Sequence, residues 1–227
     1  MQNEEKVACI PKSVLQTEQY LTRLHTGNLV VFTPENAYER ILTYVEYHPR
    51  IFVEHDPDVL QLIPYIVCYT HNIYRDVPLV FMYQRSTTGD DRLQKLWSIG
   101  LGGHVRMNES IQDAITRELK EEIGIEPTEH LKMIGYLYAP YTEVSMVHLG
   151  IIFSMYVPPD TVFDVLYQIE KRKELYPQTY EIEKLELWNA QTLRYLILRA
   201  SSYKLEDWSH TLILHPEFLH LFSPVWE

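Results

Sequence analysis

Three glutamates, Glu118, Glu121 and Glu122, stand three and four residues apart in the middle of the chain. On an α-helix, residues at i, i+3 and i+4 have neighbouring side chains. Three ionised carboxylates that are this close repel one another, and a divalent cation removes the repulsion. A site built only from oxygen ligands favours Mg²⁺ or Mn²⁺ over softer metals. The spacing therefore predicts a metal site on one face of a helix.

The residues around these glutamates predict a single helix over residues 110–123. Asn108 or Ser110 is suited to cap its start. Gly124 and then Pro127 are suited to end it. With about 100° of rotation per residue, four aliphatic side chains form a stripe that faces the core. These are Ile111, Ile115, Leu119 and Ile123.

Glu122 falls inside that aliphatic stripe, about 40° from Glu118 around the helix. The alternative interpretation of such glutamates is an ordinary solvated face. It fits poorly, because the helix already has a solvated face of Asp113, Thr116, Arg117 and Lys120. A carboxylate among isoleucines is unfavourable unless a partner compensates its charge. We therefore predict that Glu122 binds a metal ion.

Residues beside the helix are suited to support the site. Gly102 and Gly103 let the backbone approach the helix closely, so a glycine carbonyl could join the metal ligands. Arg117 and Glu109 are expected to form an ion pair that holds the loop against the helix.

The run from Gly103 to Ile125, GHVRMNESIQDAITRELKEEIGI, resembles the motif of the Nudix (MutT-like) hydrolases. It fits G-x5-E-x7-R-E-U-x-E-E-x-G-U, with U aliphatic, at every fixed position. The resemblance covers about residues 62–200. It implies an α/β fold, namely an α/β/α sandwich around a mixed sheet. The wider run over residues 61–105 is also similar to a longer Nudix subgroup labelled only as predicted phosphoesterases.

The resemblance implies roles for the residues of the motif. It implies metal binding and catalysis by Glu118, Glu121 and Glu122, with Mg²⁺ or Mn²⁺ as the cofactor. The carbonyl of Gly102, just before the first motif glycine, is implied as a further ligand. Structural support is implied for Gly103, Glu109, Arg117 and Gly124.

Family members sometimes use one more acidic residue outside the motif. Here that residue is Glu143, Glu181 or Glu183, and the sequence leaves the three open. Arg85 ends the strand-like run FMYQRS, where family members often carry an arginine near the substrate. It could bind a phosphate through two hydrogen bonds, or it is a surface arginine at a strand end.

Other side chains near the motif have two interpretations each. His104 could reach a phosphate, or it could stabilise the glycine loop by a hydrogen bond. Tyr136, Tyr138 and Tyr141 could stack on a base, or they could pack on the sheet. We include His104, Tyr138 and Glu143 with Arg85 as candidate substrate-binding residues.

Several runs rich in branched and aromatic residues predict strands. They cover residues 62–70, 78–86, 96–105, 130–140 and 144–157. Before them we expect a helix capped by Thr33, with Pro34 in its first turn. After them we expect a loose stretch to Pro177 with a short helix over 168–174, an amphipathic helix within 186–201, and a final helix. We divide the chain into an N-terminal extension packed on the core (1–61), a Nudix domain (62–200) and a C-terminal helical tail (201–227).

The composition narrows the classes of partner that the protein is expected to bind. The 227 residues carry a formal charge of −11 and no Lys/Arg cluster, which disfavours duplex nucleic acid. No apolar run reaches the length of a membrane span, and the first residues do not resemble a secretory signal. Cys9 and Cys68 have no metal-ligand spacing, which favours a reducing, cytoplasmic setting. The N-terminal extension could also form a homodimer contact.

The sequence therefore predicts a Mg²⁺-dependent hydrolase that cleaves a diphosphate joined to another moiety, with a nucleotide-derived small molecule as its partner. One alternative is a Nudix module that binds a nucleotide without cleaving it, which degraded glutamates would favour. A second alternative is an isomerase of an isoprenoid diphosphate, which needs an active-site cysteine. Cys68 lies in an apolar run and suits that role poorly.

Overall fold

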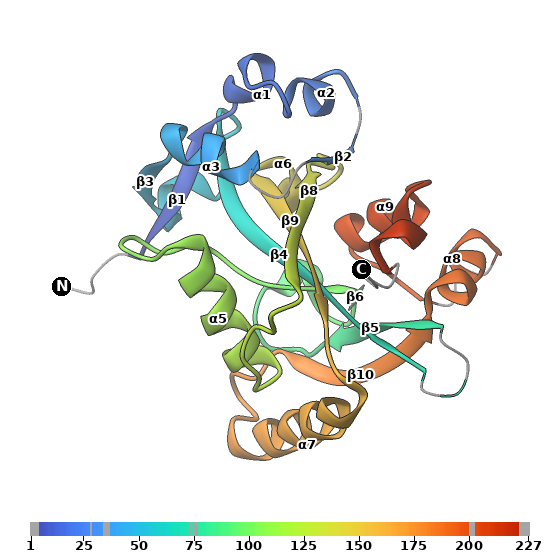
Figure 1. The fold of residues 1–227 in the computed structure, drawn as a ribbon. Coiled ribbons are helices and arrows are strands. Elements are labelled where there is room, and N and C mark those ends of the chain that lie inside the picture. The colour runs from blue at the N-terminus through green and yellow to red at the C-terminus, as the bar shows by residue number, and fades with distance from the viewer. Residues whose placement is uncertain are drawn as a thin grey trace.

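The computed structural model describes residues 5–27, 29–33, 37–72, 74, 77–199 and 203–222. A mixed sheet crosses the molecule, with helices on both of its faces (Figure 1). Its main strands run in the order β10-β5-β4-β9-β8-β2. They are β2 (Val30–Phe32), β4 (Val59–His71), β5 (Pro78–Arg85), β8 (Leu131–Leu137), β9 (His148–Tyr156) and β10 (Ile182–Asn189).

The two long central strands, β4 and β9, are parallel, whereas the neighbouring pairs on this path are antiparallel. Both faces of β4 are covered, so nearly all of its side chains are buried. This explains its continuous apolar sequence. Successive side chains of a strand point to opposite faces. Ile66 and Cys68 accordingly join one hydrophobic core, while Tyr65 and Val67 join the other.

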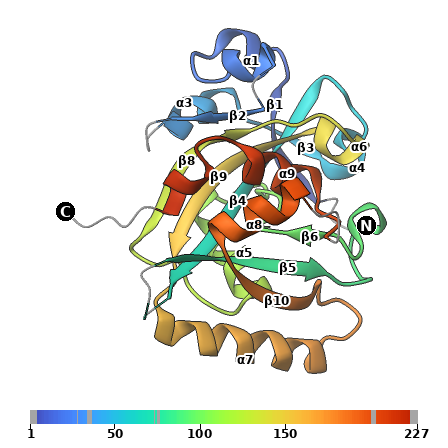
Figure 2. The ribbon, with the colours of Figure 1, turned by 90° about the vertical axis from the view of Figure 1, so that its right-hand side faces the viewer.

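The first core lies under α5 (Ile111–Glu122) and α7 (Pro159–Leu175) and extends to the N-terminal helices. The second core lies under the C-terminal helices: α8 (Ala190–Arg199), α9 (Asp207–Leu214) and the 3₁₀ helix η4 (Phe218–Phe222). Figure 2 shows α8 and α9 in front of the sheet, with α5 behind it. The expected α/β/α sandwich around a mixed sheet, with a region before the domain and C-terminal helices, is confirmed.

The N-terminal region contains a strand that the sequence analysis did not predict. This strand, β1 (Lys6–Pro11), pairs with β4 and with β3 (Glu46–Pro49). The other elements of the region are short: α1 (Val14–Thr17), α2 (Thr22–His25), α3 (Tyr38–Ile41), the 3₁₀ helix η2 (Leu42–Tyr44) and α4 (Arg50–Val53). The helix expected after Thr33 is therefore only α3 and η2, and Pro34 lies outside the described residues.

The segment between Pro158 and Pro177 is more ordered than the sequence suggested. The expected short helix over 168–174 is part of α7, which has 17 residues. Proline at its first position suits a helix start, and Val162, Val165 and Ile169 face the core. Exposed apolar side chains on the opposite face, including Phe163 and Tyr167, hide this periodicity in the sequence.

Short elements complete the region around the motif. They are the 3₁₀ helix η3 (Asp91–Leu93), β6 (Trp97–Ser98), β7 (Gly100–Leu101) and α6 (Glu143–Met146). The run 144–157, expected to be one strand, begins instead with α6, because the side chain of Thr142 caps a helical turn there. Among the helices of the described residues, none is long and apolar enough to cross a membrane.

Candidate active site

Helix α5 begins and ends as its sequence requires. The Ser110 side chain accepts a hydrogen bond from the Asp113 N–H, and Asp113 accepts one from the Ser110 N–H. Of the two candidate caps, Ser110 is the one used, and Asn108 adopts a left-handed turn before it. At the other end, Gly124 has φ of 77° and donates its N–H to the Leu119 carbonyl.

The aliphatic stripe of α5 faces the core, and two of the three glutamates lie beside it. Glu118 and Glu122 are each 9% exposed. Burial raises the pKa of Glu122 well above its usual value, the charge of Glu118 adds to this rise, and Arg85 opposes it. The pKa of Glu118 is also above its usual value, because burial raises it more than the neighbouring Arg117 lowers it. Glu121 points outward, with its side chain 56% exposed.

Arg117 joins the loop before α5 to the helix. Its guanidinium donates two hydrogen bonds to Glu109, of 2.7 and 2.9 Å, and a third of 2.8 Å to the His104 carbonyl. It also donates to Glu118 at short range. The same arginine thus fixes the Gly102–His104 backbone and one of the two buried carboxylates.

The glycine pair touches these carboxylates directly. The Gly102 N–H donates to Glu122 Oε2 at 3.2 Å. Gly102 has φ of +143°, and a Cβ there would lie 1.9 Å from the Pro64 carbonyl oxygen. A Cβ on Gly103 would lie 2.4 Å from a Glu118 oxygen. Only glycine fits at either position without rearrangement.

The donor chemistry at this point suits a hard divalent cation. Glu118 and Glu122 are both buried, and the charge of Glu118 raises the pKa of Glu122. Carboxylate and carbonyl oxygens are the ligands that Mg²⁺ prefers. Within the described residues, no three His, Cys, Asp or Glu side chains converge as a complete metal site. Glu121 points outward and Arg117 holds Glu118. In this structure the three glutamate side chains do not converge on one point.

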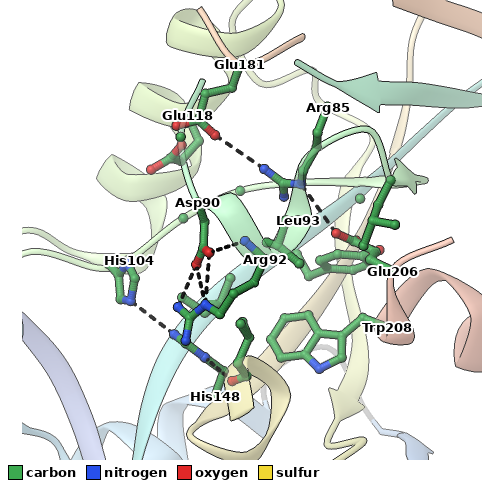
Figure 3. Close-up of a pocket in the computed structure, with 18 of the residues that line it drawn as sticks. Arg85, Asp90, Arg92, Leu93, His104, Glu118, His148, Glu181, Glu206 and Trp208 are labelled. Carbon is green, nitrogen blue, oxygen red and sulfur yellow. Dashed lines mark hydrogen bonds and ion pairs between the residues drawn. The ribbon is translucent and has the colours of Figure 1, made fainter. Parts of the chain in front are cut away.

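The buried carboxylates open onto a cavity of about 1190 Å³. Its walls come from regions far apart in the sequence: the N-terminal region, the loop before β6, the α6 region, the start of β10 and the start of α9 with its N-cap residue. Figure 3 shows side chains from several of these regions around the cavity. Arg92 in the loop bonds Asp90 at 2.6 Å and lies 3.5 Å from Glu54 of the N-terminal region. The contact with Glu54 joins the loop before β6 to the N-terminal region.

A family model described as NUDIX domain matches residues 67–208. The match covers more than half of the 227 residues. It includes α5 and the cavity residues of the loop before β6, of the start of β10 and of the start of α9. The chain belongs to the Nudix family. Members of this family typically use divalent metal ions, which agrees with the donor chemistry around Glu118 and Glu122.

Several solved structures are similar to the chain, and the first of those that follow supports the fold. Tm1382, a protein provisionally classed as a Nudix hydrolase, has a TM-score of 0.64 at 19% identity, over 92% of this chain and 97% of that chain. A MutT/Nudix family protein from Listeria innocua has a TM-score of 0.49 at 17% identity, over 68% and 89%. The Nudix domain of Shewanella oneidensis NrtR, crystallised with ADP ribose, has a TM-score of 0.46 at 14% identity, over 68% of this chain and 84% of that chain. No curated protein matches the chain.

Arg85 lies inside the Nudix cavity rather than on the outer surface. Its side chain is only 16% exposed, at the end of β5. The guanidinium lies 3.3 Å from Glu181 and 3.5 Å from Glu206, and 5.7 Å from the centre of the Tyr83 ring. Arg85 is therefore part of the cavity wall, not an exposed arginine at a strand end.

The three candidates for a further acidic residue occupy different places. Glu181 lines the cavity beside Arg85, and its charge contributes to the raised pKa of Glu122. Glu143 lines another part of the same cavity, in the first turn of α6. Glu183 is absent from the described lining and pairs with Lys95 at 3.3 Å.

His104 lines the cavity, but its ring is already engaged. Its Nε2 lies 2.9 Å from Gln61 Oε1 and 3.2 Å from His148 Nε2. His148 Nδ1 lies 2.6 Å from the Val144 carbonyl, so that nitrogen carries the proton and Nε2 is left to accept. Burial, and next the neighbouring His148, lower the pKa of His104 to about 2. These contacts favour the loop-stabilising interpretation.

The tyrosines after the motif are mostly packing residues. Tyr136 is 1% exposed, and Tyr138 is 6% exposed with its hydroxyl donating to the Met146 carbonyl at 3.3 Å. Neither is among the described lining residues, so the structure gives no support to Tyr138 as a substrate contact. Tyr141 does line the cavity and is 62% exposed.

The sequence analysis missed the contribution of the start of α9 and its N-cap residue. Glu206, Asp207 and Trp208 line the cavity. The ring of Trp208 makes edge contacts with Tyr65 and His148. The only hint in the sequence was a tryptophan and two acidic residues in the run LEDWSH.

Proposed function

We propose that the protein is a Mg²⁺-dependent Nudix hydrolase that cleaves the diphosphate of a nucleoside diphosphate joined to another moiety. The observation that carries this proposal is the pair of buried carboxylates, Glu118 and Glu122, which face one cavity with Arg85. The intact glutamates favour cleavage over a module that only binds a nucleotide.

In this proposal Glu118, Glu121, Glu122 and the Gly102 carbonyl hold Mg²⁺. A bound Mg²⁺ supplies a water of lowered pKa and neutralises charge on the phosphoryl oxygens. Such neutralisation matters here, because the protein has a formal charge of −11 and would otherwise repel a diphosphate.

The remaining groups of the chain orient the reactants. Arg117 keeps the glycine loop and Glu118 in place through the contacts described above. Arg85 binds a phosphate oxygen of the substrate. Glu181 is the further acidic residue, supported by its place beside Arg85 and by its charge effect on Glu122. It accepts the proton that the attacking water loses.

The experiment is a substrate panel with product identification. Nucleotide sugars, dinucleoside polyphosphates, ADP-ribose, NADH and nucleoside triphosphates are incubated with the full-length protein and Mg²⁺. We expect a nucleoside monophosphate and the other phosphorylated half as products. EDTA should abolish turnover, and Mg²⁺ or Mn²⁺ should restore it. Full activity after exhaustive chelation would contradict the metal-dependent mechanism.

A matched pair of variants tests the residues. Glu181→Gln and Glu183→Gln make the same chemical change two positions apart, but only Glu181 lines the cavity. We expect Glu181→Gln to lower kcat by at least about a hundredfold, the lower end of the range for loss of a general base. Glu183→Gln should stay close to the parent. Equal effects of the two variants would remove Glu181 from the mechanism.

A further inference from the structure

Glu206 is a buried carboxylate, 6% exposed, that reaches the active site from the far end of the chain. It precedes α9 as the N-cap residue and lies next to Arg85 (Figure 3). A buried carboxylate is stable only when hydrogen bonds or opposite charges satisfy its oxygens. The partners of Glu206 therefore indicate what it does.

The two oxygens of Glu206 have different partners. Three hydroxyls converge on Oε1: Tyr65 at 2.9 Å, Ser209 at 3.1 Å, and Ser98 at short range. The other oxygen, Oε2, faces Nε of Arg85 at 3.5 Å. The hydroxyls fix the carboxylate from one side, which aims its remaining oxygen at the arginine.

One interpretation is that Glu206 only anchors the C-terminal segment. That segment is already attached by its backbone: Trp97 N–H donates to the Lys204 carbonyl at 2.8 Å, and Glu206 N–H donates to the Trp97 carbonyl at 3.0 Å. Leu212 and Ile213 of α9 are fully buried in the second core. Anchoring the C-terminal segment does not require the contact between Glu206 Oε2 and Arg85.

We propose that Glu206 is a positioning residue for Arg85 and sets the direction in which its guanidinium meets a phosphate of the substrate. This inference rests on the proposed function, in which Arg85 binds that phosphate. Glu181 approaches the guanidinium at Nη1 and is 46% exposed, whereas Glu206 approaches at Nε and is buried. The buried partner fixes the arginine, because the exposed one is free to turn into solvent.

The contact between Oε2 and Nε is a charge pair at 3.5 Å without a hydrogen bond, so the guanidinium, which has five donors in a rigid plane, keeps N–H groups for a second anion. Without Glu206, the guanidinium would keep Glu181 as its ion-pair partner and would be drawn toward it. The substrate would then have to displace that ion pair. Loss of Glu206 should therefore weaken binding of the substrate without removing any group that touches it.

A double-mutant cycle between the two residues tests this inference. The parent, Arg85→Lys, Glu206→Gln and the double variant are compared as full-length proteins with Mg²⁺. Glutamine keeps the shape and leaves an amide oxygen for the three hydroxyls, while its NH₂ group faces Arg85. The readouts are Kd for ADP by titration calorimetry, and kcat and KM for the best substrate of the panel.

We expect each single change to raise Kd for ADP and KM about tenfold, with a smaller effect on kcat. The double variant should be no worse than about twentyfold, because residues in contact do not act independently. Independent losses, multiplying to about a hundredfold, would overturn the role of Glu206. If Glu206→Gln does not fold, the same cycle is run with Tyr65→Phe, which removes one of the hydroxyls that hold Oε1.

Leu212→Ala is the control for general loosening of the C-terminal segment. It creates a cavity under α9 and should lower the melting temperature, yet leave Kd for ADP within about twofold. A tenfold loss in this control would show that Glu206 acts only as an anchor.

The results distinguish failure of the role proposed for Glu206 from failure of the proposed function. Coupled losses in ADP binding, with no turnover of any panel compound, would support Glu206 and overturn the hydrolase. Turnover with independent losses would do the reverse. A parent that neither binds ADP nor cleaves any compound would overturn both.

Discussion

At the scale of single residues, the active site depends on carboxylates in unfavourable surroundings. Glu118 and Glu122 are buried, burial raises the pKa of both, and the charge of Glu118 raises the pKa of Glu122 further. Their sequence spacing made them predictable, because the relation between i and i+4 is a property of any helix. Glu206 was not predictable in this way. Its contact with Arg85 joins residues more than a hundred positions apart, and no local pattern encodes it.

The first prediction concerns Glu122→Gln. This change removes one buried charge and keeps the shape, so the metal-free protein should be as stable as the parent or more stable by about 1 kcal/mol. Turnover should fall by at least about a hundredfold, the order seen when an electrostatic stabiliser is lost. Mg²⁺ should raise the melting temperature less than in the parent. Parental turnover with an unchanged Mg²⁺ shift would show that Glu122 is not a ligand.

The second prediction concerns the pH dependence of stability and Cys9. Burial raises the pKa of this thiol from 9.0 to about 12. Between those values the unfolded chain has lost a proton that the folded chain keeps, so ν_U − ν_N is negative and stability falls as pH rises. The slope from this thiol is up to about 1.4 kcal/mol per pH unit.

Urea unfolding at about pH 8 and about pH 10.5 measures this slope. Several buried tyrosines with raised pKa values, including Tyr65 and Tyr136, also contribute at alkaline pH. Cys9→Ala keeps those tyrosines and removes the thiol. The comparison is therefore between the parent and the variant in how steeply the free energy of unfolding changes with pH. The variant should lose less stability than the parent over this range. Equal slopes would show that the Cys9 thiol does not titrate differently in the two states.

At the scale of elements, the sequence was most informative where local signals agree. Helix α5 combines a capping residue, an aliphatic stripe and a terminal glycine, and its structure matches the prediction within one residue at each end. Strand β1 and the first half of α7 were missed for opposite reasons. In β1 the short run KVACIP has little alternation, and in α7 exposed aromatic residues hide the buried face. Both are stabilised by packing against distant residues.

The third prediction tests the capping of α5. Ser110→Ala removes the hydrogen bond to the Asp113 N–H and should lower the free energy of unfolding by about 1 kcal/mol. Thr116→Ala makes a similar truncation in the middle of the same helix, where alanine is favoured, and should be neutral or stabilising. Chemical denaturation of both variants measures the difference. Equal destabilisation would mean that the cap contributes little.

At the scale of the whole molecule, the N-terminal region and the Nudix core share both structure and site. Cys9 in β1 lies opposite Gln61 in β4, and Ile10 and Leu60 belong to the same hydrophobic core. Glu5, Arg50 and Glu54 line the cavity. The described part of residues 1–60 would by itself keep a short strand pair and helices of one turn, which we expect to bury too little apolar surface to fold.

The two cysteines report on whether these parts unfold together, because Cys9 lies in the N-terminal region and Cys68 in the Nudix core. Both thiols are buried and their pKa values are raised, so neither should react with a thiol reagent near neutral pH in the folded protein. Single-cysteine variants, Cys9→Ala and Cys68→Ala, assign each signal along a urea titration. Since β1 and β4 share hydrogen bonds and a core, the two thiols should become reactive at the same urea concentration. If Cys9 reacts well before Cys68, the N-terminal region unfolds on its own, and the cavity wall that it supplies is lost while the core stays folded.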